Sequence, residues 1–306
     1  MITVLVVTAV ALAIVAALIY WYAFAVAERT SRPAISEEAM KLFHPRRLLY
    51  PLGMVVTIGL AIALTAPTPS DAAEIKVLTS RAMHHVLTDL GGTFERTSGH
   101  KVTLVLAPPT EIMKRVVDGQ IVDVVMSGAT VDNLVKQGKI AAGDRVLLAR
   151  VGIGVAVRAG APKPDISSPE ALKRTLLGAK SIVYTDPAVG GASGIHFEKV
   201  LDRLGIAKEV KAKSTKNPLA ATKPSAEFVA RGEAELGIQL ISEIVSVPGV
   251  ELLGPLPGDL QSMTAILAGI LKTAPEPEAA RTLLRFLTSP AAAPAIKAAG
   301  MEPGSP

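Results

Sequence analysis

The chain has 306 residues, no cysteine and a formal net charge of +5 at pH 7. This positive charge is small and is not gathered in a long basic run, so the sequence does not favour a nucleic-acid-binding protein. Without cysteine the chain can form no disulfide, and its composition alone does not assign it to a compartment.

The sequence begins with a strongly apolar segment. Residues 2–27 carry no charged side chain and exceed the roughly 20 residues that a helix needs to cross a bilayer. We interpret residues 1–39 as a hydrophobic extension, either the product of a mis-assigned start or a real membrane anchor. A membrane-anchored sensor domain is one functional hypothesis, and this segment alone motivates it.

A second apolar run, residues 52–66, has the context of a signal peptide. Basic side chains precede it within residues 41–47, and small residues follow it at 70–73. A basic segment, an apolar segment and a small-residue cleavage site are the three parts of a secretory signal. The pattern predicts a signal peptide over residues 40–72 and export to the periplasm. The alternative is a transmembrane hairpin made of both apolar runs.

From residue 73 on, segments with strand character alternate with segments of helical spacing. Residues 122–126 are almost entirely apolar, as expected of a strand that is buried on both faces. The predicted strands lie at residues 74–78, 102–106, 122–126, 151–157, 180–184 and 235–240. The predicted helices lie at residues 82–96, 111–118, 131–137, 170–177, 195–204, 227–231, 278–287 and 291–298. This order predicts an α/β fold with doubly wound, mostly parallel sheets, in which ligands bind where the strands end.

Four stretches resemble the periplasmic molybdate-binding proteins, and they occur in the order of that family. They are EIKVLTSRAMHHVLTDLGGTFERTSGHKV (74–102), GQIVDVVMSGATVDNLVKQGKI (119–140), TDPAVGGASGIHFEKVLDRLGI (185–206) and GEAELGIQLISEI (232–244). The resemblance implies the type II periplasmic-binding fold, with two α/β lobes joined by two crossover strands. It assigns residues 73–152 plus 252–306 to lobe 1 and residues 153–251 to lobe 2. It also implies a monomer that captures its ligand between the lobes and delivers it to the membrane permease of an ABC transporter.

The hydroxyl groups that hold the oxyanion in that family are largely replaced in this chain. The family's serine after the first strand falls on Ala82, and its serine-rich loop after the second strand falls on residues 108–110, where only Thr110 has a hydroxyl. The family's tyrosine falls on Leu240. These replacements favour a small anion other than molybdate, and we expect a carboxylate.

Arg81 follows a predicted strand and precedes a predicted helix. Helix N-termini favour anions, and a guanidinium can hold a carboxylate through two parallel hydrogen bonds. The alternative is an exposed arginine at the rim of the site. The glycine-rich turn at residues 190–194 presents free N–H groups and the hydroxyl of Ser193 before another helix. The predicted ligand-binding residues are Thr79, Ser80, Arg81, Pro109, Thr110, Ser127, Gly128, Gly191, Ser193, Gly194 and Gln239.

Two functional hypotheses follow. The first is the substrate-binding protein of an ABC transporter, which needs no cofactor and carries out no chemistry. The second is an isomerase of a tricarboxylate such as aconitate, because some such isomerases resemble this binding-protein family. An isomerase needs a general base near an acidic C–H bond, and His84, His85 and His196 are the candidates because histidine titrates near neutral pH. The histidine spacing does not match a zinc motif, so we expect no bound metal.

Overall fold

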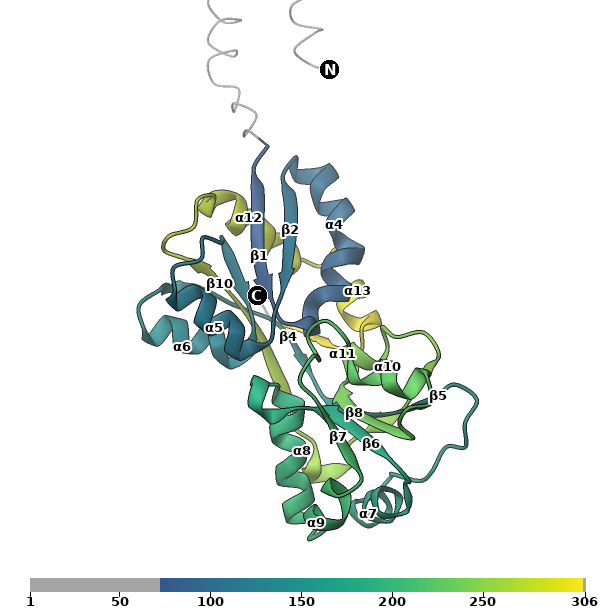
Figure 1. Cartoon of the computed structure of the whole chain (residues 1–306). Helices are drawn as coiled ribbons and strands as arrows, with labels where there is room; N and C mark the ends of the chain where they lie inside the picture. The colour runs from purple at the N-terminus through teal and green to yellow at the C-terminus, as the bar shows by residue number, and fades with distance from the viewer. Residues whose placement is uncertain (1–71, 305–306) are drawn as a thin grey trace, which may run out of the picture. The chain divides into compact units, whose positions relative to one another are not determined.

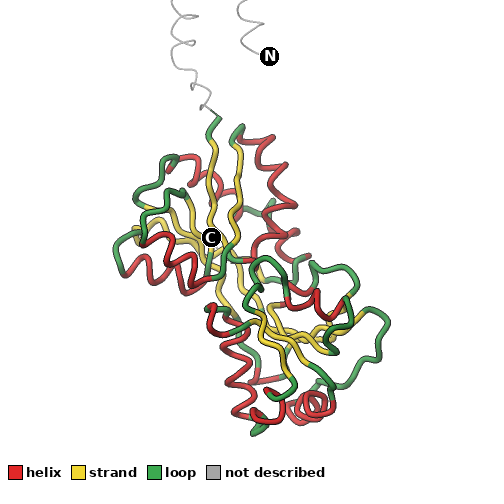
Figure 2. Tube along the Cα trace, viewed as in Figure 1, coloured by secondary structure: helices red, strands yellow, loops and turns green. Residues whose placement is uncertain are grey.

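The computed structural model describes residues 72–304 and contains two β-sheets with helices packed against them (Figure 1). Figure 2 shows the strands of each sheet between helices. The apolar extension and all but the last residue of the expected signal peptide lie outside the described residues. Among the described residues no helix is long and apolar enough to cross a membrane.

The first sheet has six strands in the order β11-β4-β10-β3-β1-β2. The strand β1 pairs in parallel with β2 and β3, whereas β10 runs antiparallel to β3 and β4, and β11 antiparallel to β4. The strands are β1 (Glu74–Thr79), β2 (Lys101–Leu106), β3 (Val124–Met126), β4 (Ile140–Val151), β10 (Thr264–Leu271) and β11 (Glu302–Pro303).

Helices cover both faces of the first sheet. Alternate residues of a strand point to opposite faces, so Val77 belongs to the core beneath one helix group and Leu78 to the core beneath the other. One group is the 3-10 helix η1 (Arg81–Met83), α4 (His84–Ser98), α12 (Pro277–Leu287) and α13 (Ala293–Ala298). The other group is α5 (Pro109–Val117) and α6 (Gly128–Lys136).

The second sheet has five strands in the order β7-β6-β8-β5-β9. The strand β6 pairs in parallel with β7 and β8, whereas β5 runs antiparallel to β8 and β9. The strands are β5 (Ile153–Arg158), β6 (Ile182–Thr185), β7 (Ser214–Asn217), β8 (Leu236–Leu240) and β9 (Val250–Pro255). The helices are α7 (Pro169–Gly178), η2 (Pro187–Val189), α8 (Ala192–Arg203), α9 (Ala207–Lys211), α10 (Ser225–Ala230) and α11 (Ile241–Ile244).

The chain crosses between the sheets twice. Only Gly152 separates β4 from β5, and the return runs from β9 through η3 (Gly258–Leu260) to β10. The predicted two-lobed α/β fold is therefore confirmed. Each sheet is mixed, because the strands on either side of the crossings run antiparallel to their neighbours and only three strands of each sheet run parallel.

Five strands, β4, β7, β9, β10 and β11, were not predicted from the sequence. The segments that form β4, β7 and β10 lack a clear alternation of polar and apolar residues. In β10, TAILAGIL, most positions are buried on both faces of the sheet, and alanine and glycine have low strand propensity. Pairing with β3 on one side and β4 on the other makes this segment a strand.

Candidate functional site

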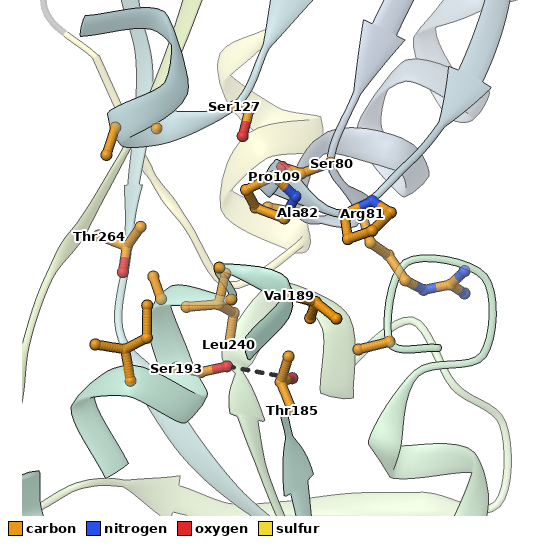
Figure 3. A pocket seen from close by; sticks show the side chains of 18 of the residues that line it. Ser80, Arg81, Ala82, Pro109, Ser127, Thr185, Val189, Ser193, Leu240 and Thr264 are labelled. Atoms are coloured by element: carbon orange, nitrogen blue, oxygen red, sulfur yellow. Dashed lines mark hydrogen bonds between the residues drawn. The ribbon is translucent and has the colours of Figure 1, made fainter. Parts of the chain in front are cut away.

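A cavity of about 340 Å³ lies between the two lobes. Its first-lobe wall comes from the loops that follow β1, β2 and β3 and from the start of β10. Its second-lobe wall comes from the segment between β6 and α8, the first turns of α8, the loop before α10 and α11. Figure 3 shows side chains from both lobes around this space. The cavity therefore lies where the parallel strands end, the usual ligand position in open α/β sheets.

The structure brings most of the predicted ligand-binding residues to this cavity. Those that line it are Ser80, Arg81, Pro109, Ser127, Gly128, Gly191 and Ser193. The positions at which the resemblance implied missing hydroxyls also line it, and Ala82, Pro109 and Leu240 present apolar surface there (Figure 3). The wall thus combines hydroxyls and N–H groups with apolar patches.

Two predicted residues are buried beside the cavity instead of lining it. The hydroxyl of Thr79 lies 2.9 Å from the carbonyl oxygen of Ser80 and 3.2 Å from that of Met126. The Oε1 atom of Gln239 accepts a hydrogen bond from the Ala226 N–H at 3.1 Å. Both side chains therefore bind the backbone that shapes the cavity.

Two further predicted residues lie where the lobes or elements meet. The Thr110 hydroxyl, in the first lobe, donates to the carbonyl oxygen of Val189 in the second lobe at 3.2 Å. A Cβ atom at Gly194 would lie 1.9 Å from the carbonyl oxygen of Thr185. Glycine at position 194 therefore allows α8 to pack against the end of β6.

The N-termini of two helices reach the cavity from opposite lobes. In the first lobe, α6 follows Ser127, whose side chain does not cap the helix in the described structure. In the second lobe, α8 follows Gly191, which has no side chain to cap it. First-turn N–H groups of a helix lack partners within the helix and carry partial positive charge. The two helices therefore favour an anion between the lobes.

Hydroxyl groups accompany each of these helix starts. In the first lobe, Ser127 Oγ lies 3.3 Å from Thr130 Oγ1. In the second, Ser193 Oγ lies 3.5 Å from Thr185 Oγ1, the contact drawn in Figure 3. Thr130, Thr185 and Thr264 line the cavity but were missed from the sequence. Thr185 ends β6, and the rule that ligands bind at strand ends could have identified it.

Arg81 spans the gap between the lobes. Its Nη1 atom donates to the carbonyl oxygens of Ala221 and Thr222 in the second lobe, both at 3.4 Å. Its Nε atom is buried and has no hydrogen-bond partner within the described residues. In Figure 3 the guanidinium extends toward a loop of the second lobe. Arg81 is half-buried at the cavity wall, so the alternative of an exposed arginine at the rim does not describe it.

The structure separates the three candidate histidines. His196 lines the cavity, and its Nε2 atom lies 2.8 Å from the carbonyl oxygen of Leu260. A carbonyl oxygen can only accept, so Nε2 carries the proton and Nδ1 of the neutral ring is free to accept one. His84 and His85 are not among the cavity residues; burial, Arg81 and His85 together lower the pKa of His84. His85 is exposed and contacts Asp89 at 3.3 Å.

Two ionisable residues of the cavity, Lys199 and Glu243, had no sequence signal. Lys199 lies one turn after His196 on α8. Glu243 lies on α11 and is buried, and burial raises its pKa to about 7, although Gln239 and Arg81 act in the opposite direction. Among the described residues no cluster of three or more metal-ligating side chains could hold a metal ion.

Comparison with known proteins places the chain in a family. Residues 75–302 match the family model described as "Bacterial extracellular solute-binding protein". An aconitate isomerase from Pseudomonas sp. is 37% identical over 258 residues, which cover 81% of this chain and 96% of that protein. The molybdate-binding protein ModA of Azotobacter vinelandii is 28% identical over 254 residues, which cover 81% of this chain and 96% of that protein.

Solved structures share the same fold. The periplasmic molybdate-binding protein of Azotobacter vinelandii superimposes with a TM-score of 0.62 at 23% identity, covering 74% of this chain and 98% of that chain. The sulfate-binding protein SubI of Mycobacterium tuberculosis has a TM-score of 0.60 at 17% identity, covering 76% of this chain and 87% of that chain. At these identities the likeness supports the fold alone.

Proposed function

Because this chain belongs to the bacterial extracellular solute-binding proteins, we propose that it captures a small carboxylate anion in the cavity between its lobes. The observation that carries this proposal is the pair of helix N-termini, those of α6 and α8, which reach the cavity from opposite lobes. Each of these helix N-termini lies beside two hydroxyl-bearing side chains, so each lobe offers its own set of hydrogen-bond donors.

The distribution of donors favours a carboxylate over a tetrahedral oxyanion. An oxyanion such as molybdate needs donors on every side of a small centre, whereas Ala82, Pro109 and Leu240 are apolar parts of this wall. A molecule with two or more carboxylates on a carbon skeleton needs donors at its ends and apolar contact between them. The cavity volume of about 340 Å³ lies near the lower limit of small-molecule sites, which span roughly 300–1,000 Å³.

The family and the sequence suggest how such a receptor works. We infer export to the periplasm by the segment over residues 40–72 and delivery of the ligand to the membrane permease of an ABC transporter. In this scheme closure of the lobes on the ligand is the signal that the permease recognises. We infer that the chain acts as a monomer, and one chain supplies both walls of the cavity.

A second candidate function is isomerisation of a tricarboxylate. Two observations favour it: the 37% identity to an aconitate isomerase over 96% of that protein, and the presence of His196 and Glu243 in the cavity wall. Both functions need the same ligand site, so the carboxylate-binding proposal does not depend on which of them is right.

Calorimetry tests the proposed ligand class. Full-length protein in a mild detergent would be titrated with molybdate, tungstate, sulfate, citrate, cis-aconitate and trans-aconitate, and its unfolding followed by differential scanning calorimetry. We expect heat of binding and stabilisation with carboxylates only, by about 2.7 kcal/mol at 100 times the dissociation constant. Binding of molybdate or tungstate without any binding of carboxylates would overturn the proposal.

A further inference from the structure

Glu243 is the one acidic residue among the described residues that line the cavity. Its exposed fraction is 9%, and it lies at the third position of α11, directly after β8. The other ionisable residues of the wall are Arg81, Lys199 and His196. A buried carboxylate is costly, and in its ionised form it repels a bound anion, so its place in the wall of an anion site calls for an explanation.

The surroundings of Glu243 contain buried polar atoms without partners. Within residues 72–304 these atoms are Arg81 Nε, Gln239 Nε2 and Ser242 Oγ, and the three residues belong to η1, β8 and α11. The helix α11 packs against both η1 and β8. Native proteins keep few such atoms, and those they keep often belong to functional sites. The atoms cluster around the one acidic residue of the cavity.

We propose that Glu243 is the catalytic base that removes a proton from a carbon atom of an unsaturated polycarboxylate held in the cavity and returns it two carbons away. The inference rests on the proposed carboxylate binding and on the second candidate function, isomerisation of a tricarboxylate, and it adds the residue that moves the proton. Neither the histidines predicted from the sequence nor a metal is needed for this step.

The step balances without any other reactant. The Glu243 carboxylate takes a proton from the methylene carbon of propene-1,2,3-tricarboxylate. The electron pair of the broken C–H bond forms a new double bond to the central carbon, while the pair of the old double bond moves to the far carbon. The protonated Glu243 then gives its proton to that far carbon. The product is the same tricarboxylate with its double bond shifted, so cis and trans isomers interconvert with no net change in protons or electrons.

The charged groups around Glu243 suit this reaction. Burial raises its pKa to about 7, so near neutral pH the carboxylate is available as a base and the acid form can return the proton. Arg81 faces Glu243 from η1, and Lys199 and His196 reach the same cavity from α8. Together with the N-termini of α6 and α8, the cations Arg81 and Lys199 stabilise the negative charge that develops on the substrate when its proton leaves.

Proton NMR of the full-length protein with cis-aconitate in D₂O tests the proposal. We expect the wild-type protein to form trans-aconitate, with deuterium entering at carbon. Glu243→Gln should lower the rate by roughly 10²- to 10⁴-fold, while calorimetric titration still detects cis-aconitate binding. Glu243→Asp should retain part of the activity. Glu170→Gln, an exposed residue on α7, should behave as the wild type does.

Each failure has its own meaning. Wild-type protein that binds cis-aconitate but neither converts it nor exchanges its protons would overturn the inference and leave carboxylate binding intact. Absence of carboxylate binding would overturn both. Full activity of Glu243→Gln, or a loss confined to His196→Gln, would overturn the assignment to Glu243. If Glu243→Gln does not fold, Glu243→Asp and His196→Gln decide between the two candidate bases. Glu243→Asp should lower kcat, whereas His196→Gln should keep the wild-type pH profile of kcat/KM, and loss of that pH dependence in His196→Gln would overturn the assignment.

Discussion

The side-chain amide of Gln261 is hydrogen-bonded to both main-chain groups of Ile153. Its Oε1 atom accepts from the Ile153 N–H at 2.9 Å, and its Nε2 atom donates to the Ile153 carbonyl oxygen at 2.9 Å. Ile153 begins β5 just after the first crossing between the lobes, and Gln261 lies on the return crossing. This pair therefore joins the two segments about which the lobes of a binding protein move.

Gln261→Ala should destabilise the protein, because it leaves two part-buried main-chain groups of Ile153 without partners. We expect a loss of about 1–3 kcal/mol, which lowers Tm by roughly 2–4 °C per kcal/mol for a chain of this size. Differential scanning calorimetry measures the change. Gln137→Ala, at an exposed position, is the control; equal Tm values for the two variants would contradict the role of the pair.

Gly194→Ala should prevent α8 from packing against β6. The added Cβ atom would meet the Thr185 carbonyl oxygen at 1.9 Å, and that oxygen is backbone that cannot turn away. We expect a loss of at least about 3 kcal/mol, the upper part of the usual range for overpacking, measured by chemical denaturation. Gly178→Ala, where the space is open, should be neutral. A Gly194→Ala protein of normal stability would show that the end of β6 adjusts.

Arg81→Lys should weaken carboxylate binding, because lysine keeps the charge but loses the planar guanidinium that bonds the Ala221 and Thr222 carbonyl oxygens of the second lobe. We expect the Kd for the best carboxylate to rise by about 10- to 100-fold, the equivalent of about 1.4–2.8 kcal/mol. Isothermal titration calorimetry gives the value. Arg285→Lys, on the exposed side of α12, should leave Kd unchanged, and an unchanged Kd for Arg81→Lys would argue against contact with the ligand.

The stability of the second lobe should fall as the pH is lowered from about 4.5 to about 2. Hydrogen bonds from Lys216, Lys211 and Tyr184 lower the pKa of Glu198 from 4.5 to about 2, with distances of 2.9, 2.9 and 3.0 Å. A carboxyl group with a lowered pKa in the folded state contributes stability above its unfolded pKa. That contribution is lost as pH falls through the folded value.

Glu198→Gln should remove part of this pH dependence. We expect the difference in unfolding free energy between pH 7 and pH 2 to shrink by about 1–2 kcal/mol, less than the pKa shift alone implies because solvent screens the ion pairs. Urea denaturation at both pH values measures it. Glu209→Gln, an exposed residue on α9, should keep the full dependence, and equal slopes for both variants would contradict the prediction.

Local sequence patterns were enough to predict the fold class and much of the cavity. The apolar spacing within residues 82–96 predicts a helix, and α4 covers most of that range. Because ligands bind where strands end, the same reasoning led to Ser80, Ser127 and Ser193, which line the cavity. The binding roles of these residues stay predictions until a ligand is measured.

The residues that were missed depend on contacts between distant segments. Glu243 follows the strand β8 by three positions, and in the sequence it resembles any acidic residue of a surface helix. The packing of α11 against η1 from the other lobe and against β5, β8 and β9 of its own lobe buries it. Arg81 was predicted as a ligand-binding residue, but its partners Ala221 and Thr222 lie in a loop of the second lobe that no local pattern connects to it.

The sequence by itself determined the alternation of strands and helices that indicates an α/β fold and the glycine-rich turn before α8. These are properties of neighbouring residues, and they follow from periodicity and side-chain chemistry, whereas the loss of hydroxyls at Ala82 and Leu240 was implied by the family resemblance. The tertiary structure alone decided that the N-termini of α6 and α8 reach one cavity and that a carboxyl group is buried in its wall. The physical reason is that the two crossings between the lobes bring distant segments together. The burial of Glu243 and the electrostatic field of the two helix N-termini arise from that arrangement, and local spacing does not encode them.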